Sequence, residues 1–188
     1  MKINCNNRHF VGISGPQPTY LVTVADSEKD TTDIIAVEWA TPLSVNPPLF
    51  GIVVSQNKNS HDMIKKAGVF TVNIPSVDIA KEMYWAGSHT GRKYKDKIAE
   101  SGLTSRPGKI NANSVSLEEA VGYFECKVVN EVKIGNNVMF IGEVQAAVAS
   151  GDLFDTEKGM WYPDKLHNIY RVAHEYFVTN STETLAVT

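Results

Sequence analysis

Residues 33–63 read DIIAVEWATPLSVNPPLFGIVVSQNKNSHDM, and this stretch decides the fold. In its first part Ile35, Val37 and Trp39 alternate with small or acidic residues, which is the two-residue period of a β-strand. A polar turn and a Pro-Pro pair follow. Proline favours an extended backbone and has no N–H group to donate to a neighbouring strand. The apolar run 49–54 then predicts a second, largely buried strand.

The loop after this second strand is rich in hydrogen-bond donors. It reads SQNKNS over residues 55–60. Ser60 is placed to cap a helix over residues 60–67, with Gly68 as its stop. Free backbone N–H groups and the helix dipole favour an anion there, so the junction is a candidate phosphate site to which Lys58 adds charge. The alternative is a polar loop with an ordinary cap, since the chain has neither a P-loop nor a G-x-G-x-x-G turn.

Composition places the chain among ordinary globular proteins. Its 188 residues suffice for one domain with a sizeable core, and 43% apolar with 21% charged residues is usual for such a domain. A net charge of −3 gives no reason to expect nucleic acid or an anionic membrane as a partner. We see no signal segment, no membrane-length apolar run and no metal-ligand pattern. Cys5 and Cys126 lack motif spacing, so we expect reduced thiols in a cytoplasmic protein, with a disulfide between them as the alternative.

The rest of the chain predicts further short strands and helices. The clearest hairpin pairs residues 123–134 with 138–149 across a Gly-Asn-Asn turn, and on its first strand Glu125 and Cys126 face opposite ways. Strands are also expected at 20–25 and 69–74, and short helices at 78–86 and 96–101. This pattern argues for an antiparallel barrel that is closed or nearly closed.

An ordered set of short pieces spans residues 10–150. The pieces are Tyr20-Leu21-Val22-Thr23, Ala40-Thr41-Pro42-Leu43-Ser44 before Pro47-Pro48, residues 55–60, residues 69–75, Asp96-Lys97-Ile98 and residues 140–144. The set resembles the flavin reductase-like family with an FMN-binding split barrel, and within it the flavoredoxin branch. The resemblance implies a mainly β fold, an antiparallel Greek-key split β-barrel with short peripheral helices. It also implies that residues 1–188 form a single FMN-binding domain, with a core at 10–150 and a C-terminal extension at 151–188.

The same resemblance implies where the cofactor lies. The FMN phosphate is expected in the donor loop, among Ser55, Gln56, Lys58, Asn59, Ser60 and His61. The flavin ring is expected along Glu38, Trp39, Ala40 and Thr41. Lys97 is expected to reach the pyrimidine edge or the phosphate, and Ser88, on the polar loop 88–95, to line the ring.

The residues themselves leave other roles open. Trp39 could be an apolar strand residue on the face of Ile35 and Val37, Glu38 could face solvent, and Asp96-Lys97 could simply begin a helix. A histidine at a helix start, such as His61, is usually unremarkable. The chain also departs from the family pattern, because Glu38 and Trp39 stand where many relatives carry small hydroxyl residues, and Ile98 replaces a frequent Phe.

Three functions fit these features. In the first, FMN takes a hydride from NAD(P)H and passes electrons to free flavin, iron or another acceptor; no catalytic side chain is then required. In the second, a flavoredoxin-type carrier exchanges electrons with a redox protein and has no nicotinamide step. In the third, less favoured, a non-enzymatic β-barrel binds a ligand. A homodimer is expected from the resemblance and from the aromatic residues within 161–177, which could instead cover the barrel of their own chain.

Overall fold

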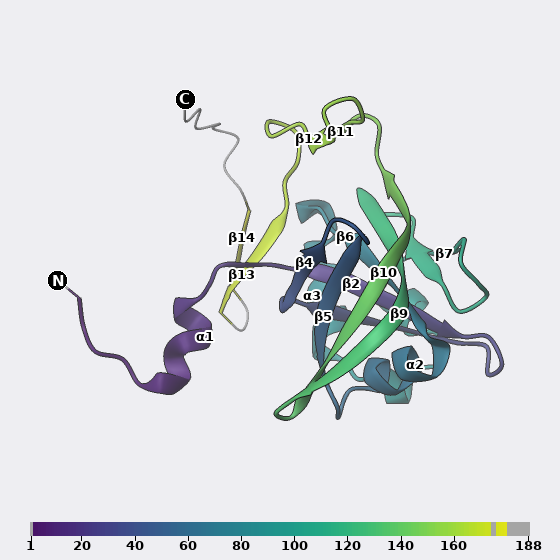
Figure 1. Ribbon diagram of the computed structural model, residues 1–188, viewed down its shortest axis with the longest axis horizontal. Coiled ribbons are helices and arrows are strands. Elements are labelled where there is room, and N and C mark those ends of the chain that lie inside the picture. Colours follow the sequence, from purple (N-terminus) through teal and green to yellow (C-terminus); the bar gives the residue numbers. More distant parts are fainter. Residues whose placement is uncertain (1, 174–175, 180–188) are drawn as a thin grey trace.

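The computed structural model describes residues 2–173 and 176–179, and its centre is a seven-stranded antiparallel sheet that curls into a split barrel (Figure 1). The strand order is β3-β2-β6-β9-β10-β5-β4, in which the neighbours β6 and β9, and β10 and β5, are far apart in the sequence. This is a Greek-key arrangement, as expected. The strands are β2 (Tyr20–Asp26), β3 (Thr31–Val37), β4 (Ala40–Ser44), β5 (Leu49–Ser55), β6 (Val69–Ile74), β9 (Gly122–Ile134) and β10 (Asn137–Ala149).

Short helices and small sheets surround the barrel. Helix α2 (Asn59–Ala67) packs on β2 and β3, while α3 (Ala80–Ser88) and α4 (Lys97–Glu100) pack on β3. A small sheet, β1-β13-β14, joins the two ends of the chain beside the barrel (Figure 1). None of the helices in the described residues has both the length and the apolar character needed to cross a membrane. The other elements are η1 (Asn7–His9), α1 (Phe10–Ile13), β1 (Gln17–Pro18), η2 (Val77–Ile79), η3 (Gly91–Lys93), β7 (Ser105–Pro107), β8 (Val115–Leu117), β11 (Phe154–Asp155), β12 (Met160–Trp161), β13 (Ile169–Ala173) and β14 (Tyr176–Thr179).

Two hydrophobic clusters form the core, one on each face of the sheet. The first fills the barrel and contains Val22, Phe50, Phe70 and Phe140. The second lies between the sheet and α3 with α4, and contains Leu21, Ile34, Met83 and Ile98. Successive residues of a strand point to opposite faces, so β2 and β3 are buried on both sides. A site built on β3 therefore rests on a well-packed strand.

The prediction that the first strand of this stretch continues through Trp39 is wrong. Strand β3 stops at Val37, and the N–H of Ala40 donates to the carbonyl oxygen of Glu38 at 3.0 Å. The chain turns there and continues as β4, where the sequence suggested only a polar turn. Trp39 thus lies at a corner with 41% of its surface exposed, away from the buried face of Ile35 and Val37. The other strands and the long hairpin named above are confirmed.

The two cysteines are both free. Cys5 is exposed, whereas Cys126 lies within the first cluster. Burial raises the pKa of the Cys126 thiol to about 12, and the neighbouring Glu125 carboxylate adds to the shift. The buried thiol therefore stays protonated and unreactive at neutral pH.

Glu125 is a completely buried acid that the strand alternation did not single out. Its carboxylate accepts hydrogen bonds from the backbone N–H groups of Lys109 and Ile110, at 2.8–3.0 Å, and from the hydroxyl of Ser114 at 2.6 Å. A buried acid with several donors replaces most of its lost hydration. Through these contacts, strand β9 anchors the connection between β7 and β8.

We expect Glu125→Leu to lower the free energy of unfolding by about 3 kcal/mol, because several buried donors would lose their acceptor. Urea denaturation measures the change. The matched control is Glu131→Leu on the same strand, where the acid is exposed and pairs with Lys65. That control should cost less than about 1 kcal/mol. Equal losses in the two variants would contradict the anchoring role of Glu125.

Candidate functional site

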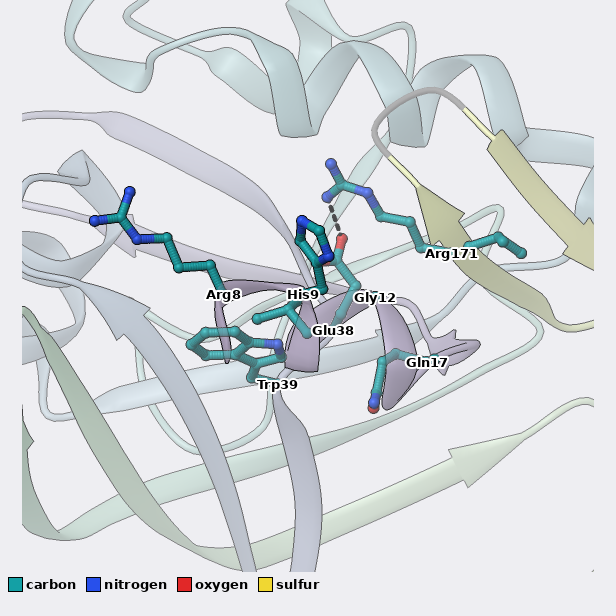
Figure 2. A pocket seen from close by; sticks show the side chains of 10 residues that line it. Arg8, His9, Gly12, Gln17, Glu38, Trp39 and Arg171 are labelled. Atoms are coloured by element: carbon teal, nitrogen blue, oxygen red, sulfur yellow. Dashed lines mark hydrogen bonds and ion pairs between the residues drawn. The ribbon is translucent and has the colours of Figure 1, made fainter. Parts of the chain in front are cut away.

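Two pockets lie along strand β3, one beside its middle at Asp33 and Ile35 and the other just past its end at Glu38 and Trp39. The first, called the polar pocket, has a volume of about 110 Å³ and is lined by Asp33, Ile35, Lys58, Asn59, Ser60, residues 86–91 and Lys97. The second, called the outer pocket, has a volume of about 520 Å³ and is shown in Figure 2. It is lined by Arg8, His9, Val11, Gly12, Gly15, Gln17, Glu38, Trp39, Arg171 and Val172. Together the two pockets contain seven of the twelve site residues that we predicted, namely Glu38, Trp39, Lys58, Asn59, Ser60, Ser88 and Lys97.

The N-terminus of helix α2 opens onto the polar pocket. The helix starts one residue earlier than expected, at Asn59, and its cap position is Lys58, which makes no side-chain capping bond. Ser60 is therefore not the cap. Its hydroxyl donates instead to Oδ2 of Asp33 at 2.8 Å. Of the first backbone N–H groups, that of His61 donates to the carbonyl oxygen of Lys58 at 3.2 Å, and those before it can meet an anion.

Asp33 is the hub of the polar pocket, with only 1% of its surface exposed. Besides the Ser60 hydroxyl, its carboxylate accepts from Nδ2 of Asn59 at 3.1 Å and from the N–H of Ile34 at 2.9 Å. Nζ of Lys97 lies 3.4 Å from its Oδ1. Every one of these partners is a donor, so the carboxylate is surrounded as an ionised acid requires.

Lys97 reaches the pocket from the start of helix α4. Asp96 caps this helix by accepting from the N–H of Ala99, which is the helix start that the sequence suggested. Nζ of Lys97 donates to the carbonyl oxygen of Ile34. Burial lowers the pKa of the Lys97 ammonium from its usual value, and the Asp33 carboxylate opposes that shift. Lys97 is thus a buried lysine paired with a buried acid.

The loop after α3 covers the polar pocket. The His89 ring stacks on Trp85, with ring centroids 4.2 Å apart, and Arg92 pairs with Asp62 of α2 at 3.0 Å. Gly91 packs so closely on Asp33 that a Cβ atom at this position would overlap the carboxylate. The close approach of backbone to acid therefore requires glycine.

Glu38 and Trp39, on the β3–β4 turn, form one wall of the outer pocket. Oε1 of Glu38 lies 2.7 Å from Nη1 of Arg171 on β13, and this ion pair ties the turn to the C-terminal part of the chain (Figure 2). In the view of Figure 2, Arg8 and the His9 ring lie above the exposed Trp39 ring. Within the described residues, the Arg8 guanidinium has no hydrogen-bond or ion-pair partner. The pocket thus combines an aromatic surface with an excess of positive charge.

Five predicted residues line neither pocket. They are Ala40, Thr41, Ser55, Gln56 and His61. Ala40 and Thr41 begin β4, next to the outer pocket, and the carbonyl oxygen of Ser55 accepts from the N–H of Lys58 and so shapes the donor loop. His61 turns away, with its ring 5.5 Å from Phe140 and its Nδ1 3.0 Å from Asp62. Their contacts with a cofactor stay predictions.

Sequence reasoning missed several residues of the site. Asp33 carried a signal, because an acid at the start of an apolar strand run is unusual. Gly91 carried a weaker one, as a glycine inside a polar loop. Arg8, His9 and Arg171 carried none, since only the pairing of β1 with β13 brings them to the β3–β4 turn.

The fold agrees with what the comparisons find. The model of the flavin reductase like domain matches residues 14–170, and the chain belongs to this family. An uncharacterized protein of Archaeoglobus fulgidus is 32% identical over 169 residues, which cover 89% of this chain and 90% of that protein. The reductase component of a 4-nitrophenol 4-monooxygenase/4-nitrocatechol 2-monooxygenase from Rhodococcus opacus is 29% identical. The match covers 76% of this chain and 70% of that protein. Flavoredoxin of Desulfovibrio vulgaris (Miyazaki F) has a similar fold, with a TM-score of 0.86 at 23% identity, covering 100% of this chain and 97% of that one.

We expect Gly91→Ala to lower the free energy of unfolding by about 1–3 kcal/mol, the usual cost of forcing an extra carbon into a packed site. Urea denaturation measures it. Gly151→Ala serves as the control, because a Cβ atom there meets nothing within 4 Å. If the two variants were equally stable, the close contact between Gly91 and Asp33 would not exist in solution.

Proposed function

We propose that this protein is an FMN-binding oxidoreductase that takes a hydride from NAD(P)H and passes the electrons to an acceptor. The observation that carries the proposal is the pair of pockets joined by one strand. A pocket with two lysines at a helix N-terminus lies beside the middle of β3, and an aromatic, open pocket lies just past the end of the strand. A ligand with a phosphate at one end and a planar ring at the other suits this arrangement. We take residues 1–188 as one domain for this purpose.

The donor set of the polar pocket fits a phosphate monoester. Lys58 and Lys97 both line the pocket, together with the N-terminal end of α2. A phosphate with a charge near −2 is stabilised by cations and by free backbone N–H groups. The pocket is small and is covered by the loop that carries Gly91. A terminal phosphate, as in FMN, is therefore the group that we assign to it.

The residues of the chain hold and expose the cofactor. FMN, when bound, supplies the chemistry of hydride acceptance and electron transfer. The packed strand β3 positions the Glu38–Trp39 turn, and Trp39 offers a flat apolar face to a ring. The outer pocket gives a second molecule access to this turn, and its positive charge suits the phosphates of a nicotinamide dinucleotide. No acid–base side chain has to move a proton.

A second candidate function is electron transfer to a redox protein without a nicotinamide step. It is favoured by exposed apolar side chains on and beside β4, next to Trp39. Leu43 is 42% exposed and Val45 is 93% exposed. Exposed apolar groups gathered near a redox centre suit docking of another protein. A barrel that only binds a ligand has no observation of its own in its favour.

A homodimer is part of the proposal. Helix α1 stands away from the barrel on the N-terminal segment (Figure 1). Its apolar residues Phe10, Val11 and Ile13 are all exposed. A helix that leaves its apolar side chains uncovered in one copy can bury them on a second. Of the aromatic residues within 161–177, the side chains of Tyr176 and Phe177 lie outside the described part of the structure.

The purified protein should show the visible spectrum of FMN, and anaerobic NADH or NADPH should bleach it. Lys58→Ala should weaken FMN binding about tenfold, because one charge-assisted contact is lost. Equilibrium titration of the apoprotein with FMN measures the affinity.

The control is Lys65→Ala at the other end of α2, where the side chain pairs with Glu131. Its FMN affinity should match the wild-type value. If dithionite reduces the bound FMN but neither NADH nor NADPH does, the electron-carrier function would replace the proposed reductase function. A colourless protein that takes up no FMN would refute both.

Light scattering at micromolar concentration should give twice the chain mass of 20.7 kDa. The variant Phe10→Ser/Ile13→Ser should shift the mass toward that of one chain, since it removes apolar surface that a second copy would cover. The control Ile3→Ser changes another exposed apolar residue of the N-terminal segment, one outside α1. A wild-type mass of one chain would contradict the dimer.

A further inference from the structure

The outer pocket carries an uneven set of charges on its walls. Its volume of about 520 Å³ is within the range of sites that hold small molecules. Among the described residues that line it, Arg8 and Arg171 bring two positive charges, and Glu38 is the only acid. The lining therefore keeps one positive charge that it does not neutralise itself. A ligand with a negative group suits such a pocket.

The two arginines of the pocket differ in what they contact. The Arg171 guanidinium pairs with Glu38, and this ion pair is partly shielded from water, with 33% and 21% of the two side chains exposed. The Arg8 guanidinium has no hydrogen-bond or ion-pair partner in the described part of the chain. In the view of Figure 2 it points away from the Glu38–Arg171 pair. A bound ligand can therefore engage Arg8 without breaking a contact of the protein.

The acid of the pocket, by contrast, is already engaged. NADH and NADPH differ at the 2′ position of the adenosine ribose, which is a hydroxyl in NADH and a phosphate in NADPH. A carboxylate that accepts from the ribose hydroxyl favours NADH, whereas an arginine nearby accommodates the phosphate of NADPH. Drawing Glu38 toward a ribose hydroxyl would weaken its ion pair with Arg171, while Arg8 is open to a phosphate.

The direction of a bound dinucleotide follows from the proposed function, on which this inference rests. The nicotinamide ring has to reach the flavin at the Glu38–Trp39 turn, because hydride transfer needs the reacting atoms about 3–3.5 Å apart. The adenosine half then lies farther from the turn, along the wall that η1 and α1 contribute to the pocket. Arg8 belongs to this wall.

We propose that the outer pocket selects NADPH over NADH, and that Arg8 makes the selection by binding the 2′-phosphate of the adenosine ribose. A guanidinium binds phosphate through two parallel hydrogen bonds, which give strength and orientation together. Because Arg8 is exposed, water and salt weaken the contact, and the preference for NADPH is moderate.

The test compares the two dinucleotides on the purified protein saturated with FMN. Dissociation constants of NADP⁺ and NAD⁺ are measured by isothermal titration calorimetry, which involves no hydride transfer. Anaerobic stopped flow measures the reduction of the flavin by NADPH and by NADH. NADP⁺ should bind more than about threefold more tightly than NAD⁺. In Arg8→Gln the two affinities should come within about threefold of each other, through a loss on the NADP⁺ side.

The matched control is Arg106→Gln. Arg106 is also an exposed arginine, but it pairs with Glu118 and lines a different pocket. The substitution changes the net charge equally, and it should leave the ratio of the NADP⁺ and NAD⁺ affinities as it is. Both variants should fold, because both side chains are exposed, and a thermal scan verifies this.

The outcomes separate this inference from the proposed function. If NADH and NADPH both reduce the flavin but NADP⁺ binds less than about threefold more tightly than NAD⁺, the selection is overturned and the reductase stands. An NADP⁺ preference that survives in Arg8→Gln would also overturn it. So would an equal loss of both dinucleotides, because the arginine would then hold the pyrophosphate that they share. If neither NADH nor NADPH reduces the bound flavin, the reductase function itself fails and this inference fails with it.

Discussion

A carboxylate with almost no access to water joins three elements of this fold at one point. Asp33 on β3 accepts from Ser60 and Asn59 at the start of α2 and pairs with Lys97 at the start of α4. Each of these contacts is made in the protein interior, where an unpaired charge is costly and a fully paired one fixes geometry. The close packing of Gly91 on the same acid brings the loop after α3 into the arrangement. The position of both helix starts, and hence the polar pocket itself, depends on this one acid.

The sequence predicts most of the fold because alternation and turn chemistry act locally. The hairpin of β9 and β10 and the strands β2, β5 and β6 follow from them, and all are found. The end of β3 could not be predicted in this way. The apolar alternation of the sequence continues to Trp39, but a turn hydrogen bond between Glu38 and Ala40 ends the strand before it. Glu125 shows a second limit. Alternation assigns a residue to a face, but it does not say that a distant loop will cover that face with donors.

The candidate site was predictable where neighbours in the sequence form it. Lys58, Asn59 and Ser60 line one pocket because a strand ends and a helix begins there. The predicted capping role of Ser60 was still wrong, since its hydroxyl donates to Asp33 on strand β3, a partner that local propensity cannot reveal. The outer pocket brings together segments from both ends of the chain, and only the pairing of β1 with β13 does so. Family membership alone does not say what the site does, which has to be argued from contacts of this kind.

The ion pair between Glu38 and Arg171 ties the shape of the outer pocket to a segment that follows the barrel in the sequence. The seven strands of the barrel are complete at Ala149, so a product that ended soon after it would keep every strand of that sheet. It would lack β13, and with it the arginine wall of the outer pocket. Such a shortened protein would also lose Ile169, which is buried in the second hydrophobic cluster. The segment after the barrel thus supplies both a buried core residue and a wall of the outer pocket.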